Sequence, residues 1–136
     1  MKNRIVTIAL VLVGILSFEF INAQELTLDK EVHDYGTIKQ GANGECVFMV
    51  KNTGTAPLII SACKGSCGCT VPQCDKAPIA PGGSQEVKVK YDTKRIGAIN
   101  KSVTITSNAT NTPTKVIRIK GNILAQEPVA TPAPAK

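Results

Sequence analysis

Apolar and polar side chains alternate along short segments of this chain, and this alternation constrains its fold more than any other feature. The clearest case is residues 86–91, where Val87, Val89 and Tyr91 alternate with three charged residues. A period of two residues is that of a β-strand with one buried face. No stretch of a dozen residues repeats apolar side chains at helical spacing. The sequence therefore predicts an all-β fold.

The same alternation, interrupted by turn residues, predicts about seven short strands. Turn signals such as Pro81-Gly82-Gly83 separate them, because proline presets φ and glycine accepts positive φ. This profile is typical of an immunoglobulin-like β-sandwich, and a small closed barrel is the competing architecture. The chain has no tryptophan, so the antibody-type Cys–Trp–Cys framework is missing. The expected strands lie at 26–28, 32–38, 45–51, 58–62, 86–91, 103–106 and 117–123.

The first residues read as a secretory signal peptide. Lys2 and Arg4 precede an apolar run at 5–16, and Ala23 occupies a suitable cleavage position. We therefore expect export to the periplasm or the cell surface, with no transmembrane segment left after cleavage. The predicted parts are the signal peptide at 1–23, the sandwich at 24–124 and a Pro/Ala-rich disordered tail at 125–136.

The charge of the chain is mildly basic. The signal peptide carries two basic residues and one acidic residue, so its removal lowers the net charge from +6 to +5. Such a charge favours encounters with anionic envelope components. Nucleic-acid binding would require aromatic side chains that stack on bases, and only Tyr35, Phe48 and Tyr91 follow the signal peptide. We therefore expect no nucleic-acid partner.

Cysteines carry the unusual chemistry of the sequence. Cys63, Cys67, Cys69 and Cys74 fall within twelve residues, at C-x3-C, C-x-C and C-x4-C spacings. In an oxidising compartment such a cluster is expected to form at least one disulfide. Spacing alone leaves the pairing open: Cys63 and Cys74 could close the loop, and Cys67 could bridge to Cys69 at the cost of strain. The fifth, Cys46, shares a strand face with apolar residues and is expected to be a buried free thiol.

Two chemical alternatives use the same four cysteines. Closely spaced thiolates of Cys63, Cys67, Cys69 and Cys74 suit Cu(I) or zinc. However, the paired C-x2-C units of structural zinc sites are missing, and His33 and Met49 lie far away in the sequence. Thiol–disulfide exchange usually employs C-x-x-C at a helix N-terminus, and neither feature is present. Our main expectation is therefore no metal and no cofactor, with this cluster as the alternative site.

Other catalytic groups are scarce, so we expect no enzymatic activity. His33 is the single histidine, and Asp34 is its sequence neighbour rather than an oriented partner. A Ser-His-Asp triad would have to be built around this one residue. No glycine-rich phosphate loop precedes a helical pattern.

A succession of short motifs over residues 29–123 resembles a bacterial exported family of unknown function with an SCGCT signature. That family is similar to Hydin-like and major-sperm-protein-like immunoglobulin folds. The motifs are DYGTI at 34–38, FMVKNTGTAPL at 48–58, SCGCTVP at 66–72, PIAPG at 78–82, YDT at 91–93, SN at 107–108 and IKG at 119–121.

The resemblance implies a sandwich fold and an envelope location, and it supplies no established activity. The family pattern centres on Cys67 and Cys69, to which Cys46, Cys63 and Cys74 are additions in this chain. We therefore expect a non-enzymatic binding or structural module whose partner is an envelope protein or polymer. Strand addition at a sheet edge is one physical route to such binding. The alternative is a thiol-based metal-binding or redox protein.

Overall fold

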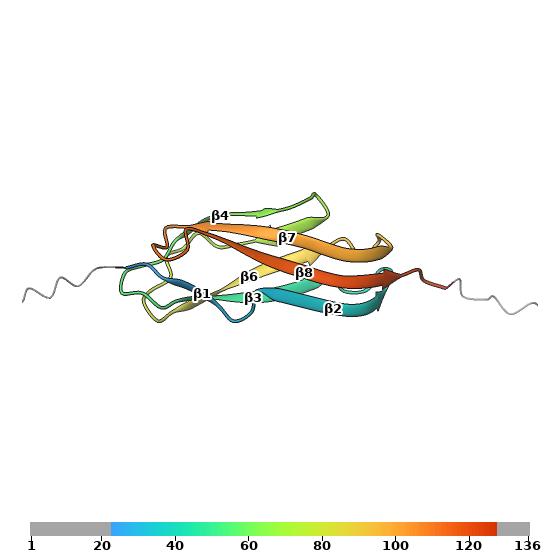
Figure 1. Cartoon of the computed structure of the whole chain (residues 1–136), viewed down its shortest axis with the longest axis horizontal. Helices are drawn as coiled ribbons and strands as arrows, with labels where there is room; N and C mark the ends of the chain where they lie inside the picture. The colour runs from blue at the N-terminus through green and yellow to red at the C-terminus, as the bar shows by residue number, and fades with distance from the viewer. Residues whose placement is uncertain (1–22, 128–136) are drawn as a thin grey trace, which may run out of the picture.

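Eight strands form two four-stranded sheets that pack face to face (Figure 1). The computed structural model describes residues 23–127, so most of the predicted signal peptide and tail lie outside the described residues. No helix in the described range is long and apolar enough to cross a membrane. The strands are β1 (Leu26–Leu28), β2 (Val32–Lys39), β3 (Glu45–Asn52), β4 (Ile60–Gly65), β5 (Thr70–Gln73), β6 (Ser84–Tyr91), β7 (Gly97–Ser107) and β8 (Thr114–Leu124).

The topology confirms an immunoglobulin-like sandwich rather than a closed barrel. One sheet has the order β1-β3-β6-β5 and the other has the order β2-β8-β7-β4, and the two remain separate. Neighbouring strands are antiparallel except β2 and β8, which pair in parallel. The strand number is eight instead of the expected seven, because the side-chain pattern does not predict β5.

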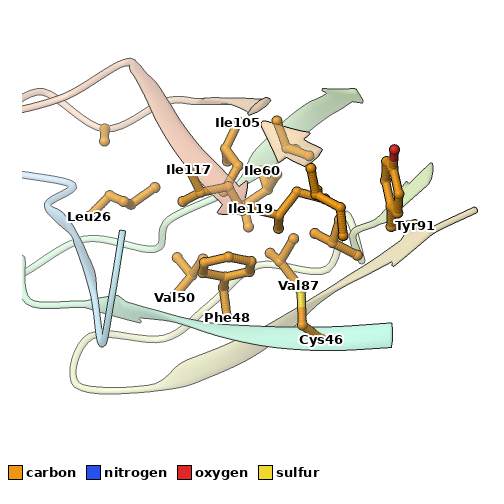
Figure 2. Packing of buried hydrophobic residues seen from close by; sticks show 14 of the residues in the cluster. Leu26, Cys46, Phe48, Val50, Ile60, Val87, Tyr91, Ile105, Ile117 and Ile119 are labelled. Atoms are coloured by element: carbon orange, nitrogen blue, oxygen red, sulfur yellow. The ribbon is translucent and has the colours of Figure 1, made fainter. Parts of the chain in front are cut away.

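The predicted alternation produces the core between the sheets. Phe48 and Val50 on β3 and Val87 on β6 are fully buried, whereas Met49 is only partly buried and the charged neighbours of Val87 face solvent. Figure 2 shows the Phe48 ring directed from β3 toward Ile117 and Ile119 of the opposite sheet. The apolar face of each strand is therefore satisfied by the other sheet, which is the condition for a stable sandwich.

The cysteine-rich segment is more regular than the sequence predicts. The strand expected at 58–62 is shifted: Leu58 forms an isolated bridge with Ile79, and β4 runs on to Gly65. Residues 70–73 form β5, which pairs with β6 through Val71 and Lys90 among others. Backbone pairing imposes this extended conformation, since the side chains of the segment show no clear alternation.

The outer edge of β2 is irregular. A register shift separates Asp34 from Thr37, and Gly36 between them has a φ of 64°. The Asp34 carboxylate accepts a hydrogen bond from the Gly36 N–H at 2.8 Å and pairs with Lys120 at 3.4 Å. Bulges and charges of this kind protect an edge strand from pairing with another chain.

Candidate functional site

The four clustered cysteines lie on one long hairpin, residues 58–79, here called the cysteine hairpin. It leaves one sheet along β4 and enters the other along β5, so it closes one side of the sandwich. Its base is fixed by two backbone hydrogen bonds between Leu58 and Ile79, of 2.9 and 2.7 Å. Both residues are buried. The base of the hairpin is therefore anchored in the core, and Cys69 near its other end is also buried in the core.

A disulfide between Cys63 and Cys74 joins the two arms of this hairpin. Cys63 lies on β4 and Cys74 follows β5, and their Cα atoms are 6.3 Å apart. Because β4 and β5 belong to different sheets, this bond links the two layers of the sandwich at their open side. The structure thus selects one of the pairings that the sequence left open.

Cys67 and Cys69 form a second disulfide in the tip of the hairpin, with Cα atoms 5.3 Å apart. The end of β4 passes very close to the start of β5 at Gly65, where a Cβ atom would lie 2.0 Å from the Thr70 carbonyl oxygen. Glycine is therefore required at this crossing, because any side chain would push the arms apart.

Backbone hydrogen bonds hold the tip in place. The Thr70 N–H donates to the Cys67 carbonyl at 3.2 Å, which closes a four-residue turn. The Asp92 N–H donates to the Cys69 carbonyl at 2.9 Å, and the Ser66 N–H donates to the Ser102 carbonyl at 2.8 Å. The tip is thus tied to the neighbouring strands of both sheets without help from its disulfide.

Thr70 is a residue that the sequence reasoning did not single out. Its side chain is 2% exposed, and its hydroxyl oxygen lies 3.6 Å from the Cys67 sulfur and 3.8 Å from the Cys69 sulfur. Both distances fall within hydrogen-bonding range for sulfur. The signal that could have identified it is its position directly after Cys69 in the SCGCT motif.

Cys46 lies apart from the hairpin, as a free and buried thiol on β3. Its sulfur points into the core beside Phe48 and Val87 (Figure 2). Burial raises the pKa of the Cys46 thiol and also that of the neighbouring Tyr35 hydroxyl. The Tyr35 O–H donates to the Gly44 carbonyl at 2.6 Å. A buried thiol held in its protonated form is unreactive, so Cys46 acts as a core residue.

His33 packs edge-on against Tyr35, with ring centroids 4.6 Å apart. Burial, followed by the positive charge of Lys30, lowers the pKa of His33. The Asp34 carboxylate accepts a hydrogen bond from the Gly36 N–H and pairs with Lys120. These contacts engage the carboxylate with groups other than the His33 ring.

Metal ligation would require free thiolates, and the structure places all four hairpin cysteines in disulfides. Over residues 23–127, no group of three or more His, Cys, Asp or Glu residues is arranged to hold a metal ion. The soft-metal alternative would therefore first need reduction of the hairpin.

Two open hollows flank the cysteine hairpin. The end hollow, of about 480 Å³, is lined by Gly68 and Cys69 of the tip and by residues 41–44, 71 and 90–94. The edge hollow, of about 440 Å³, lies between the two arms and is lined by residues 60–63, 72–74 and 76. The hairpin therefore has an accessible surface on either side.

The two disulfides are expected to contribute unequally to stability. Loop-closure entropy predicts a loss of about 3 kcal/mol when a loop the size of Cys63–Cys74 is opened, and about 1.5 kcal/mol for one the size of Cys67–Cys69. Urea unfolding of Cys63→Ser/Cys74→Ser and of Cys67→Ser/Cys69→Ser measures both losses. A larger loss from the second variant would contradict the assignment of Cys63–Cys74 as the main staple.

Comparisons with solved structures give the same fold. A protein of unknown function from Porphyromonas gingivalis W83 shares 21% identity, with a TM-score of 0.66 over 74% of this chain and 48% of that one. This chain thus spans about half the length of that relative. The PapD-like domain 7 of human CEP192 shares 11% identity, with a TM-score of 0.64 over 78% of this chain and 89% of that domain. WR4, a C. elegans MSP family member, shares 9% identity, with a TM-score of 0.53 over 74% and 99%.

Sequence comparison completes the assignment. A search of curated proteins gives no match. The family described as "Protein of unknown function (DUF1573)" matches residues 26–123, which include every strand of the sandwich except the last residue of β8. The resemblance carried by the SCGCT motif is thereby confirmed, and the chain belongs to the DUF1573 family.

Proposed function

We propose that this chain is an exported module of the bacterial cell envelope that binds an extended segment of another envelope polypeptide along β4. One observation carries the proposal. The strands β4 and β5 lie on the two arms of the cysteine hairpin, yet each pairs with a different sheet and neither pairs with the other. Their second edges therefore adjoin the edge hollow, where an added strand would find backbone partners.

The register of β4 identifies the groups that an added strand would meet. The Ser66 N–H donates to the Ser102 carbonyl, and hydrogen-bonded pairs alternate along an antiparallel ladder. Lys64 and Thr104 are therefore bonded to each other, whereas the N–H and C=O of Cys63 point away from β7. These two groups are the donor and the acceptor that we assign to the partner strand.

The other sheet edges are less suitable. Pro72 interrupts β5 and has no N–H to donate. The bulge at Gly36 interrupts β2 in the middle of the strand, whereas the register shift of β4 lies at its start, between Ile60 and Ala62. Strand β1 has only three residues. Strand addition thus favours β4.

Charge and cysteine pairing support the envelope location and the nature of the partner. Two disulfides persist best in an oxidising compartment. The chain has a net charge of +6, and exposed Lys64 and Lys76 lie on the two arms of the hairpin. A polypeptide segment with acidic side chains would therefore be attracted to this edge.

Site-specific photo-crosslinking in living cells tests the proposal. Ala62 lines the edge hollow and is exposed, so a benzophenone side chain there should form one dominant adduct with a partner. Ala98 is an exposed alanine on β7 that does not line this hollow, so the same side chain there should give none. Equal labelling at both positions, or labelling at neither, would remove the support for β4 as the docking edge.

Filling the hollow should block the partner. Ala62→Trp is expected to reduce partner capture about tenfold. The indole ring would obstruct the partner strand, and a loss of ~1.4 kcal/mol in binding free energy corresponds to a tenfold lower affinity. Ala98→Trp is the matched control and should capture normally. Hydrogen exchange provides an independent readout: the Cys63 amide should exchange more slowly with the purified partner bound. Unchanged exchange there would mean that binding does not extend the sheet.

A further inference from the structure

We propose that Cys67 and Cys69 form a redox-active pair that passes its disulfide to a dithiol polypeptide, whereas Cys63–Cys74 is a permanent staple. This activity is independent of the edge of β4. It differs from the soft-metal alternative because it uses only the tip of the hairpin and leaves the other disulfide closed.

Backbone hydrogen bonds should keep the shape of the tip when its disulfide opens. The Cys67–Thr70 turn, the Cys69–Asp92 bond and the Ser66–Ser102 bond involve only backbone atoms. The ladder between β5 and β6 begins immediately afterwards at Thr70. Reduction would therefore leave two thiols held side by side, and such a pair can close again without a search through chain conformations.

Sequence separation distinguishes the two disulfides. The cysteines of the tip disulfide are 2 residues apart, so opening this bond adds little conformational entropy to the unfolded chain. The cysteines of the staple are 11 residues apart and join two sheets, so opening the staple adds more. Exposure does not separate them, since Cys63, Cys67 and Cys74 are all half-buried. The tip bond is thus the one that the fold can release and re-form most readily.

The hydroxyl group of Thr70 lies beside both sulfurs of the tip disulfide. It lies within 3.8 Å of both tip sulfurs and is almost completely buried. A hydroxyl can donate its hydrogen to a thiolate, and hydrogen bonding to the charged form favours that form. Reduction creates a thiolate at either sulfur, and Thr70 is placed to stabilise it. No comparable donor is found at the staple among the described hydrogen bonds.

Access to the tip supports the same assignment. Gly68 lies between the two cysteines, is exposed, and has no neighbouring atom where a Cβ would stand. The end hollow opens beside it, with Lys90 and Lys94 in its lining. The tip is therefore open to solvent at Gly68, and these two cations favour the charge of an incoming thiolate. Of the two sulfur-bearing residues, Cys67 is the more exposed, since Cys69 is only 4% exposed.

The exchange is balanced in two steps. A substrate thiolate attacks the Cys67 sulfur, the bond to Cys69 breaks, and its electron pair leaves on Cys69, whose thiolate accepts the Thr70 hydrogen bond. The second substrate thiolate then attacks the substrate sulfur of the mixed disulfide and expels Cys67 as a thiolate. The substrate loses two electrons and two protons and becomes a disulfide. Cys67 and Cys69 take up the two electrons and, from solvent, two protons.

Redox titration of the purified protein tests the proposal. The folded protein is equilibrated with graded mixtures of reduced and oxidised dithiothreitol, alkylated, and analysed by peptide mass. We expect alkyl groups on Cys67 and Cys69 at reductant ratios at least tenfold below those that label Cys63 and Cys74. Circular dichroism should remain native throughout. Simultaneous reduction of both disulfides, or loss of structure together with the tip bond, would overturn the proposal.

Transfer to a reduced synthetic peptide with a C-x-x-C pair tests the activity itself. Thr70→Val should slow peptide oxidation about fivefold, the effect of one lost hydrogen bond. The control Thr106→Val, at an exposed threonine of β7, should not change the rate. Cys67→Ser/Cys69→Ser should abolish transfer, and Cys63→Ser/Cys74→Ser should preserve it. Absent transfer by the folded wild-type protein, or a reduced tip that takes up Cu(I) but oxidises no peptide, would contradict this function.

Discussion

Asn52→Ala is expected to destabilise the protein by about 4 kcal/mol, because the buried Asn52 side chain makes three hydrogen bonds to backbone groups that truncation would remove. Asn52 is fully buried at the end of β3. Its amide nitrogen donates to the Ala56 carbonyl at 2.7 Å and to the Ile79 carbonyl at 2.9 Å, and its amide oxygen accepts from the Gly54 N–H at 3.0 Å. Truncation removes the side-chain partner of the Ala56 carbonyl and of the Gly54 N–H, and it leaves the Ile79 carbonyl with only its bond from the Leu58 N–H.

The location of these partners explains the size of the effect. Ile79 is the residue that closes the base of the cysteine hairpin through its backbone bonds to Leu58. Asn52 therefore connects the end of β3, the turn after it and the base of the cysteine hairpin at Ile79. Loss of its side chain should loosen the hairpin as well as lower the global free energy of unfolding.

Asn108→Ala is the matched control for this prediction. Asn108 makes the same kinds of bond, accepting from the Ile59 N–H at 2.8 Å and donating to the Pro57 carbonyl at 3.3 Å, but it is exposed. Water can replace its bonds, so its loss should cost about 1 kcal/mol or less. Urea unfolding at equal protein concentration compares the two variants. Equal losses would show that burial is not what gives Asn52 its importance.

Asn52 also shows where sequence reasoning reaches its limit. The strand at 45–51 could be predicted because Cys46, Phe48 and Val50 recur at every second position and share one face, and all three are buried as expected. Asn52 follows in the same alternation, but asparagine before Thr-Gly is a turn signal, so the sequence places it in a turn. A polar residue belongs to a core only when specific backbone partners are brought to it, and those partners lie up to 27 residues away.

The cysteine hairpin illustrates a second limit. The spacing of the cysteines predicted disulfides but left their pairing open. The pairing follows from the assignment of β4 and β5 to different sheets, which no local pattern encodes. The parallel pairing of β2 with β8 is likewise a contact between distant segments. Side-chain periodicity thus predicts where most strands lie in the sequence. The candidate sites depend instead on which strands form the edges of the sheets, and periodicity does not predict that.

Phe48→Ala is expected to be at least as damaging as Asn52→Ala, with a loss of about 3 to 5 kcal/mol in the free energy of unfolding. The ring is completely buried between the two sheets and faces isoleucines of β8 (Figure 2). Its truncation removes apolar contacts and leaves a cavity that rigid neighbouring strands can fill only in part. Since domains of this size are typically stable by about 5–15 kcal/mol, the variant would be close to unfolding.

The polar neighbours of the Phe48 ring raise the question of whether Phe48 contributes only apolar packing. The Lys30 ammonium lies 5.5 Å from the ring centroid, and the His33 ring lies edge-on at 6.5 Å. Phe48→Leu keeps most of the apolar volume but removes the aromatic face, so a loss of about 2 kcal/mol is expected from the lost volume and the cation–π contact. Val71→Ala, at a residue 52% exposed on β5, should change stability by less than about 0.5 kcal/mol. We expect the loss in free energy of unfolding to be largest for Phe48→Ala, smaller for Phe48→Leu and smallest for Val71→Ala. This order would show that the apolar volume of Phe48 accounts for most of its contribution to stability. An equal loss from Phe48→Leu and Phe48→Ala would instead attribute this contribution to the aromatic contacts of the ring.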